Sequence, residues 1–182
     1  MGSGLKYYHW SDYARRSLWA LAHPLFRWSP RLLFKWRNCL LRVFGASIGS
    51  GARVFPDAKV TFPWNLSIGQ DSVVAWDVRL YNLSKLTIGE RVVISQGAHI
   101  CGGTHDYESA DFDLVKAEIS IGDDAWIGAD AFIGPGVRIG RGAVVGARSV
   151  VIKDVTPQAV VVGQPARIIK TRKRVRQMKP LA

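Results

Sequence analysis

A six-residue period limits what this chain can fold into more than any other feature of its sequence. From residue 121 the sequence reads IGDDAW, IGADAF, IGPGVR, IGRGAV and VGARSV, with an aliphatic residue in each first place and glycine in each second. The same spacing recurs earlier in three triplets: Ile48, Val54, Val60; Ile68, Val74, Leu80; and Ile88, Ile94, Ile100. Repeats this short are typical of a solenoid, whose units bury their apolar side only against neighbouring units.

The spacing between the triplets sets the size of one coil. Each triplet starts eight residues after the previous one ends, so two extra residues leave the repeat after every third unit. Three units, each a short strand and a tight turn, then close a triangular coil of about eighteen residues. We expect residues 46–162 to form a parallel β-helix of about five coils, with the first-place side chains stacked inside. Glycine in the second place is expected to let the backbone turn without a Cβ in the way.

Charge is divided unevenly along the 182 residues. The formal net charge is +11, but residues 1–45 and 164–182 each carry +7, which leaves −3 for residues 46–163. A nucleic-acid-binding domain would carry basic residues over its folded surface, so this distribution argues against nucleic acid as a partner. Two cysteines in unrelated contexts, Cys39 and Cys101, indicate neither a disulfide framework nor a metal site and are typical of a reducing compartment.

The N-terminal 45 residues do not follow the repeat. They are rich in Trp, Leu and Arg, and an apolar set recurs at helical spacing: Leu32, Leu33, Trp36, Leu40 and Val43. We expect residues 1–45 to form an amphipathic helical segment that caps the open end of the solenoid. A second interpretation adds a peripheral contact with the inner face of the cell membrane. The apolar runs are too short to span a bilayer and no signal-peptide pattern follows them, so we expect a cytoplasmic protein.

The C-terminal residues 163–182 also lie outside the repeat. They contain seven basic residues and no acidic one, and Pro165 stands where a first helical position would be. Proline is favoured at that position because its missing N–H would have no partner there. We therefore expect a short basic C-terminal helix that lies against the β-helix.

Between Ile100 and Ile121 the repeat is interrupted by about fifteen additional residues, a length that usually marks a functional loop. We expect an extruded loop at 102–118, with His105 held near its root by the rigid coils. A histidine in this place is a general base, a metal ligand or an ordinary surface residue. His99 is the only nearby second ligand, and two histidines without a third make a poor zinc site, so we expect no metal.

The motifs together resemble one family. The repeats, the GTHDY sequence at the root of the loop and the closing WIGADAFIGPGVRIGRGAVVGARSVVIKDV and VVVGQPARIIK are similar to hexapeptide-repeat acyltransferases that use acetyl-CoA. WSPRLLFKWRNCLLRVFGASIG, VTFPWNLSIG and RVVISQGAHICGGTHDY most resemble the colanic-acid-type O-acetyltransferases of exopolysaccharide biosynthesis. The resemblance covers roughly residues 17–172. It implies a left-handed β-helix and a homotrimer with active sites between subunits.

The resemblance also implies roles for individual residues. His105 matches the catalytic histidine that takes the proton of an acceptor hydroxyl, and Asp106 is expected to orient it, with a solvated loop charge as the alternative. The Ala129 backbone amide is expected at the developing oxyanion, where relatives often carry Ser. The residues expected to bind acetyl-CoA are Trp126, Ala129, Ala147, Ile152, Lys153, Arg167 and Lys170. Asn82 and Tyr107 are expected on the acceptor side.

We therefore expect an acetyl-CoA-dependent O-acetyltransferase that acts on a saccharide hydroxyl in exopolysaccharide or cell-surface glycan biosynthesis. A small acceptor, such as a free sugar, an amino sugar or serine, is the alternative within the same enzyme class. Two other classes are a metal-dependent hydratase with the same fold and a non-catalytic scaffold. The missing third histidine argues against the hydratase, and the intact GTHDY and PARIIK segments argue against the scaffold.

Overall fold

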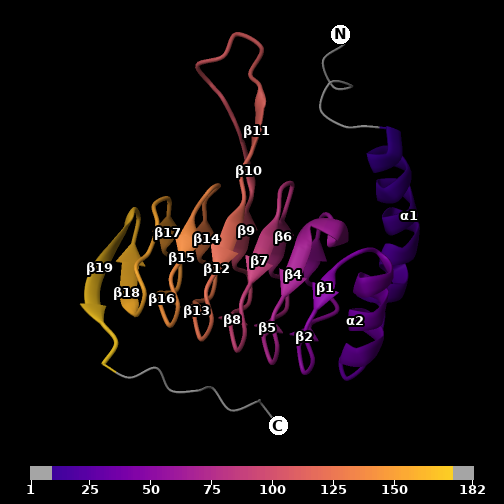
Figure 1. The fold of residues 1–182 in the computed structure, drawn as a ribbon, viewed down its shortest axis with the longest axis horizontal. Helices are drawn as coiled ribbons and strands as arrows, with labels where there is room; N and C mark the ends of the chain where they lie inside the picture. Colours follow the sequence, from indigo (N-terminus) through magenta and orange to yellow (C-terminus); the bar gives the residue numbers. More distant parts are fainter. Residues whose placement is uncertain (1–9, 174–182) are drawn as a thin grey trace.

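A column of short strands carries two helices at one end and a long hairpin on one side (Figure 1). The computed structural model describes residues 10–173. The helices are α1 (Trp10–Arg27) and α2 (Phe34–Val43), and a single 3₁₀ turn, Pro63–Asn65, interrupts one corner of the described coils. All the strands of the column run parallel except the last, and the hairpin strands pair only with each other.

The strands form three sheets, which are the sides of a triangular prism. The first sheet contains β1 (Ser47–Ile48), β4 (Leu66–Ile68), β7 (Leu86–Ile88), β12 (Ile119–Ile121) and β15 (Arg138–Ile139). The second contains β2 (Arg53–Val54), β5 (Val73–Val74), β8 (Val93–Ile94), β13 (Trp126–Ile127), β16 (Val144–Val145), β18 (Ala159–Gly163) and β19 (Ala166–Thr171). The third contains β3 (Lys59–Val60), β6 (Arg79–Tyr81), β9 (His99–Cys101), β14 (Phe132–Ile133) and β17 (Val150–Val151). Each coil passes once through each sheet, so the predicted parallel β-helix of about five coils is confirmed.

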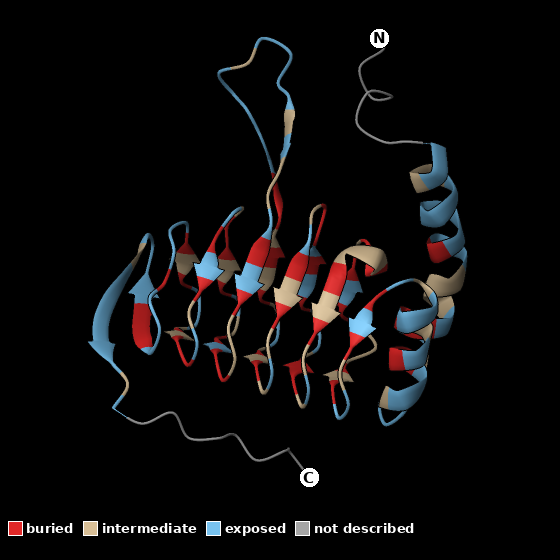
Figure 2. Cartoon of the chain, viewed as in Figure 1, coloured by how far each residue is buried: buried red, intermediate tan, exposed pale blue. Residues whose placement is uncertain are grey.

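The first-place aliphatic residues stack in register inside the prism. Parallel pairing places Ile68 beside Ile88, and Val74 beside Ile94. Three continuous columns result, one for each sheet: Ile48, Ile68, Ile88, Ile121, Ile139; Val54, Val74, Ile94, Ile127, Val145, Val161; and Val60, Leu80, Ile100, Ile133, Val151. All of these side chains are buried, and Figure 2 shows buried residues, in red, recurring along the coils. Removal of this apolar surface from water is the main force that holds the coils together.

Glycine is needed in the second place of each unit for a different physical reason from the one expected. Their backbone does not adopt the left-handed conformation; that conformation occurs two residues later, for example at Asp124 (φ 58°) and Asp130 (φ 56°). A Cβ added at Gly122 would lie 2.6 Å from the backbone nitrogen of Arg141 in the next coil. Gly128 has the same relation to the nitrogen of Ala147, also at 2.6 Å. Glycine is therefore required by the close approach of stacked coils and not by the turn itself.

Helices α1 and α2 cap the first coil by supplying hydrogen-bond donors. Along the strands, backbone N–H groups of one coil donate to carbonyls of the next, as Gly49 N does to Ile68 O, so the strand carbonyls of the first coil have no earlier coil to bond with. Side chains of the helices take that place. Arg37 Nε donates to Val54 O at 2.7 Å, Asn38 Nδ2 to Ala52 O at 2.7 Å, and Trp19 Nε1 to Val60 O at 3.0 Å. Over its described residues, 10–45, the N-terminal segment therefore caps the first coil.

The face of α2 that packs on the coils is not its most apolar face. Arg37, Asn38 and Leu41 are buried, whereas Trp36 and Val43 are exposed. The Arg37 guanidinium makes four hydrogen bonds in all, because it also donates to Ser29 Oγ, Pro30 O and Arg31 O. Burial lowers the pKa of this guanidinium. The need for donors at the coil edge therefore outweighs the hydrophobic pattern of the helix.

The predicted C-terminal helix is wrong over residues 166–171, where the chain forms strand β19. This strand pairs antiparallel with β18, and Gly163, with φ of 99°, lies at the reversal between them. The edge of β18 offers unpaired backbone groups, and Ile168 and Ile169 are β-branched residues that favour a strand. The expected domain boundary at 162/163 thus falls inside one hairpin of the sheet. Residues 174–182 of the expected helix lie outside the described residues.

Candidate active site

The interruption of the repeat forms an antiparallel hairpin that projects from a corner of the prism (Figure 1). Its strands are β10 (Gly103–His105) and β11 (Leu114–Lys116), and His105 lies opposite Leu114. The root is fixed to the coils because Gly102 N donates to Tyr81 O at 2.8 Å. A Cβ on Gly103 would lie 2.7 Å from the Leu83 side chain, so glycine lets the hairpin leave close to the coil. The predicted extruded loop is therefore confirmed as an ordered hairpin.

His105 is exposed and is oriented by Phe112, on the other arm of the hairpin. His105 Nδ1 lies 2.8 Å from the carbonyl oxygen of Phe112, and the two rings stack with centroids 4.4 Å apart and an interplanar angle of 9°. A carbonyl oxygen only accepts, so Nδ1 must carry the proton in this contact. In the neutral imidazole Nε2 is then unprotonated and available to accept a proton.

Asp106 makes hydrogen bonds within the turn of the hairpin. Its Oδ1 accepts a hydrogen bond from Glu108 N at 3.0 Å, and its own backbone N donates to Asp113 O at 2.8 Å. Both contacts close the hairpin turn, in the manner of an Asx turn. The partner of His105 Nδ1 in this structure is the backbone carbonyl of Phe112, so the orienting role expected of Asp106 stays a prediction. Sequence reasoning missed Phe112 because its contact depends on the hairpin register.

The two residues expected on the acceptor side lie in very different surroundings. Tyr107 is exposed near the tip of the hairpin. Asn82 is 1% exposed, and its amide group both accepts from Phe62 N at 3.0 Å and donates to Phe62 O at 2.6 Å. These bonds join two neighbouring coils at one corner. The side chain of Asn82 thus has a structural role, and its position does not support the expected contact with an acceptor.

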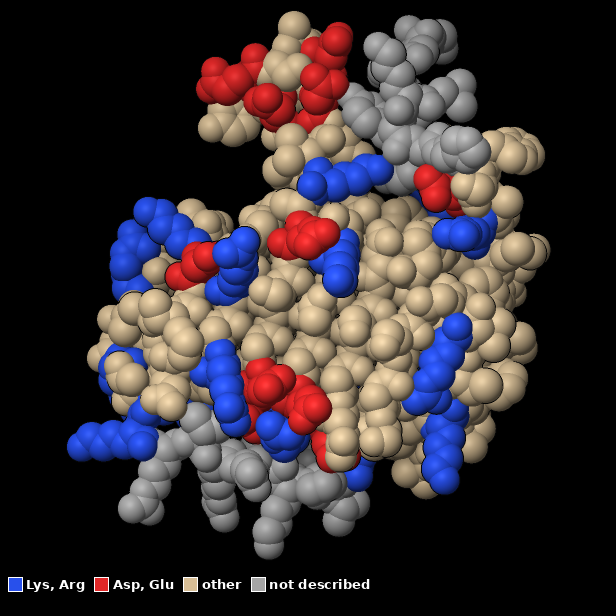
Figure 3. Space-filling model, viewed as in Figure 1, with Lys and Arg blue, Asp and Glu red and all other residues tan. Residues whose placement is uncertain are grey.

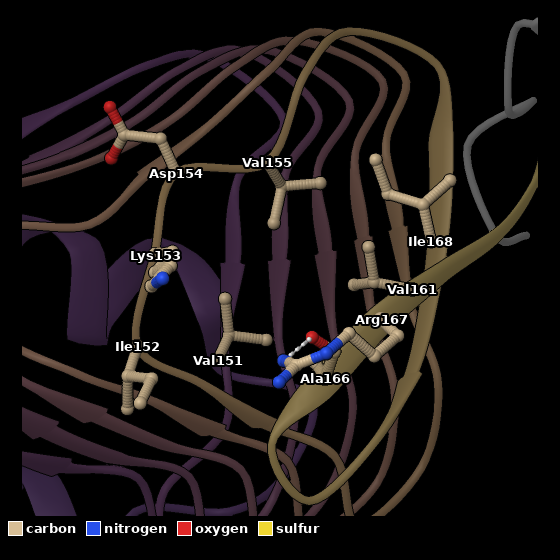
Figure 4. A pocket seen from close by; sticks show the side chains of 9 residues that line it. All are labelled: Val151, Ile152, Lys153, Asp154, Val155, Val161, Ala166, Arg167 and Ile168. Atoms are coloured by element: carbon tan, nitrogen blue, oxygen red, sulfur yellow. Dashed lines mark hydrogen bonds between the residues drawn. The ribbon is translucent and has the colours of Figure 1, made fainter.

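Several residues expected to bind acetyl-CoA line one hollow at the C-terminal end of the prism. Its volume is about 480 Å³, and Ile152, Lys153 and Arg167 all contribute to it. Figure 4 shows Ile152 and Lys153 on one turn and Arg167 on the strand that faces it. The floor is apolar, formed by Val151, Val155 and Val161 among others. Asp154 also lines the hollow, but its two cations and apolar floor suit a ligand with phosphate groups and an aliphatic arm.

The other expected donor-side residues lie along the outside of the coils. Ala129 and Ala147 occupy equivalent turns of adjacent coils, joined by the hydrogen bond from Arg148 N to Ala129 O at 2.8 Å. Trp126 is half-exposed on β13, and its Nε1 donates to Ser95 Oγ at 3.0 Å. Lys170 is exposed on β19, opposite Val160. Among residues 10–173, none of these groups contacts His105 through a hydrogen bond or a ring.

His99 belongs to the wall of the prism. Its ring packs edge-on against Phe132, with centroids 5.4 Å apart. Burial, and secondarily the Arg79 guanidinium, lower the pKa of His99 and favour its neutral form. Within the described part of the chain, no group of three His, Cys, Asp or Glu side chains is arranged to hold a metal ion.

Comparison with known proteins places this geometry in a family. The Bacterial transferase hexapeptide (six repeats) model matches residues 118–153. The Escherichia coli K12 protein that carries the name colanic acid biosynthesis acetyltransferase WcaF is 42% identical over 154 residues, which is 85% of either chain. The chain belongs to the hexapeptide-repeat acetyltransferases. Within this family, the galactoside O-acetyltransferase of Escherichia coli K12 is 30% identical over 137 residues, 74% of this chain and 68% of that protein.

Solved structures of the hexapeptide-repeat acetyltransferases have the same fold. An enzyme of this family from Vibrio cholerae, in complex with acetyl coenzyme A, superposes with a TM-score of 0.84 at 28% identity, and the match covers 96% of this chain and 94% of that one. A galactoside acetyltransferase in complex with coenzyme A also has a TM-score of 0.84, at 25% identity over 93% and 84% of the chains. These matches confirm the left-handed β-helix.

Proposed function

We propose that this chain transfers the acetyl group of acetyl-CoA to a saccharide hydroxyl, with His105 as the general base. The observation that carries the proposal is the 2.8 Å contact between His105 Nδ1 and the Phe112 carbonyl oxygen. That contact selects the tautomer in which Nε2 can accept a proton. Stacking on Phe112 limits rotation of the ring, so the base is oriented before a substrate arrives.

The reaction follows from this arrangement. His105 Nε2 takes the proton of the acceptor hydroxyl while the hydroxyl oxygen forms a bond to the thioester carbonyl carbon. The resulting imidazolium keeps its Nδ1 proton on the Phe112 carbonyl. When the tetrahedral intermediate collapses, the carbon–sulfur bond breaks and the sulfur receives the proton from Nε2. The products are an O-acetylated saccharide and free coenzyme A, and His105 returns to its neutral form.

The backbone amide of Ala129 is proposed to stabilise the oxyanion of that intermediate. Among the described residues, none accepts a hydrogen bond from the N–H of Ala129, and the same is true of Ala147. Ala129 is only partly buried, and we propose that its N–H faces the acyl donor. An amide fixed by the stacked coils needs no reorganisation when charge develops on the oxygen. The methyl side chain contributes nothing polar, so the amide alone would act.

The acyl donor is proposed to lie along these turns, with its phosphates near Lys153, Arg167 and Lys170. Support comes from the hollow at the end of the prism and from relatives solved with acetyl-CoA or coenzyme A. Because His105 stands on a projecting hairpin, we propose that it completes a donor site on another copy of the chain. A homotrimer with sites between subunits meets this requirement. We place the reaction in the cytoplasm, at the inner face of the membrane.

The test measures thiol release from acetyl-CoA with a panel of free sugars, amino sugars, serine and oligosaccharides. We expect turnover with a saccharide, and a loss of about 10²–10⁴ in kcat for His105→Ala. Thr104→Ser, a change on the same exposed strand, is the control and should keep the wild-type rate. An unchanged rate in His105→Ala would refute the mechanism. Transfer to serine alone would replace the saccharide by a small acceptor.

A further inference from the structure

The outward surface of the helical cap is apolar to a degree that its own fold does not explain. Nine large hydrophobic residues of the cap are exposed, compared with ten in the whole of the rest of the described chain. They are Trp10, Leu18, Leu21, Leu25, Trp28, Leu32, Leu33, Trp36 and Val43. We call this set the cap surface. Large exposed apolar patches mark places where a protein meets another molecule or a membrane.

The residues of the cap surface on α1 form a single stripe. Trp10, Leu18, Leu21, Leu25 and Trp28, the last directly after the end of the helix, follow one another at eight, three, four and three residues, spacings that return to one side of an α-helix. Trp19 and Phe26, on the opposite side of α1, are the buried residues that pack on the coils. The helix is thus apolar on two sides, although the fold uses only one.

Helix α2 continues the cap surface because polar side chains occupy part of the face that it turns to the first coil. Its donors, Arg37 and Asn38, point inward to the carbonyls of the first coil. Two large apolar side chains of the helix are therefore left outside: Trp36 is 45% exposed and Val43 is 75% exposed. The Trp36 indole donates to Leu25 O, at 3.2 Å, which ties the two helices into one surface.

Charge around the cap surface is strongly basic. Residues 10–45 contain one acidic residue, Asp12, and seven basic ones: Arg15, Arg16, Arg27, Arg31, Lys35, Arg37 and Arg42. Of these only Arg37 is buried. Figure 3 shows Lys and Arg side chains over the helical end of the molecule. A second copy of the same cap would bring like charges together, whereas an anionic surface would attract them.

We propose that the cap surface docks on an anionic lipid bilayer, with the leucines at the acyl boundary. Trp at both ends of the stripe and Arg and Lys around it are the residues suited to the headgroup region. Neither described helix has the length and apolar content to cross a bilayer, so the contact is peripheral. The inference rests on the proposed function in one respect: docking would bring the active site near a membrane-bound saccharide acceptor. Binding to the bilayer does not itself require acetyl transfer.

The experiment is sedimentation of the full-length protein with phosphatidylcholine vesicles, with or without one-third phosphatidylglycerol, in the absence of acetyl-CoA. We expect binding to the anionic vesicles that weakens as salt is added. Leu25→Glu should reduce binding at least about tenfold. The matched control is Ile169→Glu, at the other end of the prism, because Leu25 and Ile169 are both 58% exposed. It should bind like the wild type.

Further variants keep the outcome decisive. Leu32→Glu, on the loop between the helices, should behave like Leu25→Glu, and Lys35→Glu should weaken binding about fivefold or more. Circular dichroism melts should match the wild type, since all three side chains are exposed. The proposal is overturned by no binding to anionic vesicles at low salt, or by equal losses in Leu25→Glu and Ile169→Glu. If the protein does not bind vesicles but forms an assembly of twice the mass found for Leu25→Glu, the cap surface would be assigned to contact with a second copy. Thiol release, measured separately, reports on the proposed function.

Discussion

The coils and the hairpin use the same chain in opposite ways. In the coils every unit buries an aliphatic side chain, and each strand is paired on both sides except at the ends. In the hairpin, residues 103–116, Gly103 is the one buried residue. The hairpin keeps its shape through its own antiparallel pairing and through backbone contacts at its root. The coils therefore supply most of the stability, and the hairpin carries the proposed catalytic base. Substitutions in the coils should change stability, and substitutions in the hairpin should change the rate.

Removing apolar volume from a coil should have the largest effect on stability. Ile133 is fully buried, and Ile133→Ala should lower the free energy of unfolding by about 2–5 kcal/mol, because a cavity remains where the side chain packed. Val115→Ala, at a 41% exposed position of the hairpin, should change it by less than about 0.5 kcal/mol. Urea unfolding at one fixed protein concentration measures both. Equal losses would show that the hairpin is part of the core.

A buried ion pair between adjacent coils should give the next largest effect. Asp124 is 2% exposed, and Arg91 donates to it at 2.7 Å and 3.2 Å. This hydrogen bonding from Arg91 holds the pKa of Asp124 below its ordinary value. Asp124→Asn should lower the free energy of unfolding by about 1.5–3 kcal/mol at neutral pH.

The same pair predicts a pH dependence with a definite sign. The folded state holds Asp124 with a pKa below the ordinary value of 3.8, so its stabilisation is present above that value and is lost as pH falls through the folded pKa. The difference in unfolding free energy between wild type and Asp124→Asn should therefore shrink in acid below about pH 4. Urea titrations at successive pH values would contradict this if the difference stayed constant.

Within the hairpin, the stacked ring should affect the rate and not the fold. Phe112→Ala keeps the backbone carbonyl that accepts from His105 Nδ1 but removes the ring that holds the imidazole. A stacking energy of about 0.5–1.5 kcal/mol corresponds to a loss of about 2- to 12-fold in kcat. Thiol release measures it, together with a melt that should show little change. Phe112→Tyr, which preserves the stacked face, should restore the rate; failure to do so would remove the positioning role.

The smallest effect is expected at Asp106. Asp106→Asn keeps an oxygen that can accept from Glu108 N, so the turn should persist and kcat should stay within about threefold. A carboxylate that orients a catalytic histidine behaves differently, since its replacement by the amide can cost about 10⁴. A loss of that size in the thiol assay would assign the orienting role to Asp106 in the working enzyme and exclude the arrangement described above.

The coils could be predicted from the sequence because every unit repeats the same constraint. Ile121 and its equivalents mark the inside of the prism by spacing alone, and register follows once one coil is placed. The ends could not be predicted in this way. Arg37 is buried because first-coil carbonyls need donors, and residues 166–171 form a strand because the last parallel strand has an open edge. Both outcomes depend on backbone groups of the terminal coils that have no partner in another coil. No local pattern in the sequence indicates which groups these are.

The candidate site was predictable to the level of residue types. His105 and the hollow that contains Lys153 and Arg167 follow from motifs that remain local in the chain. Phe112 gave no signal, because its carbonyl meets His105 only in one hairpin register. Asn82 misled because an amide at a coil corner satisfies backbone groups as readily as it could bind a sugar.

The stacked coils also set the distance between the hairpin and the donor hollow. The hairpin leaves the column after β9, and the hollow begins at β17, two strands further along the same sheet. At about 4.8 Å for each strand, roughly 10 Å along the prism separates the two levels. One more coil would preserve every stacked column and yet move these levels apart by a whole step. The distance along the prism between His105 and the donor hollow can therefore change only in steps of one coil. The number of coils between them is thus a property on which natural selection can act.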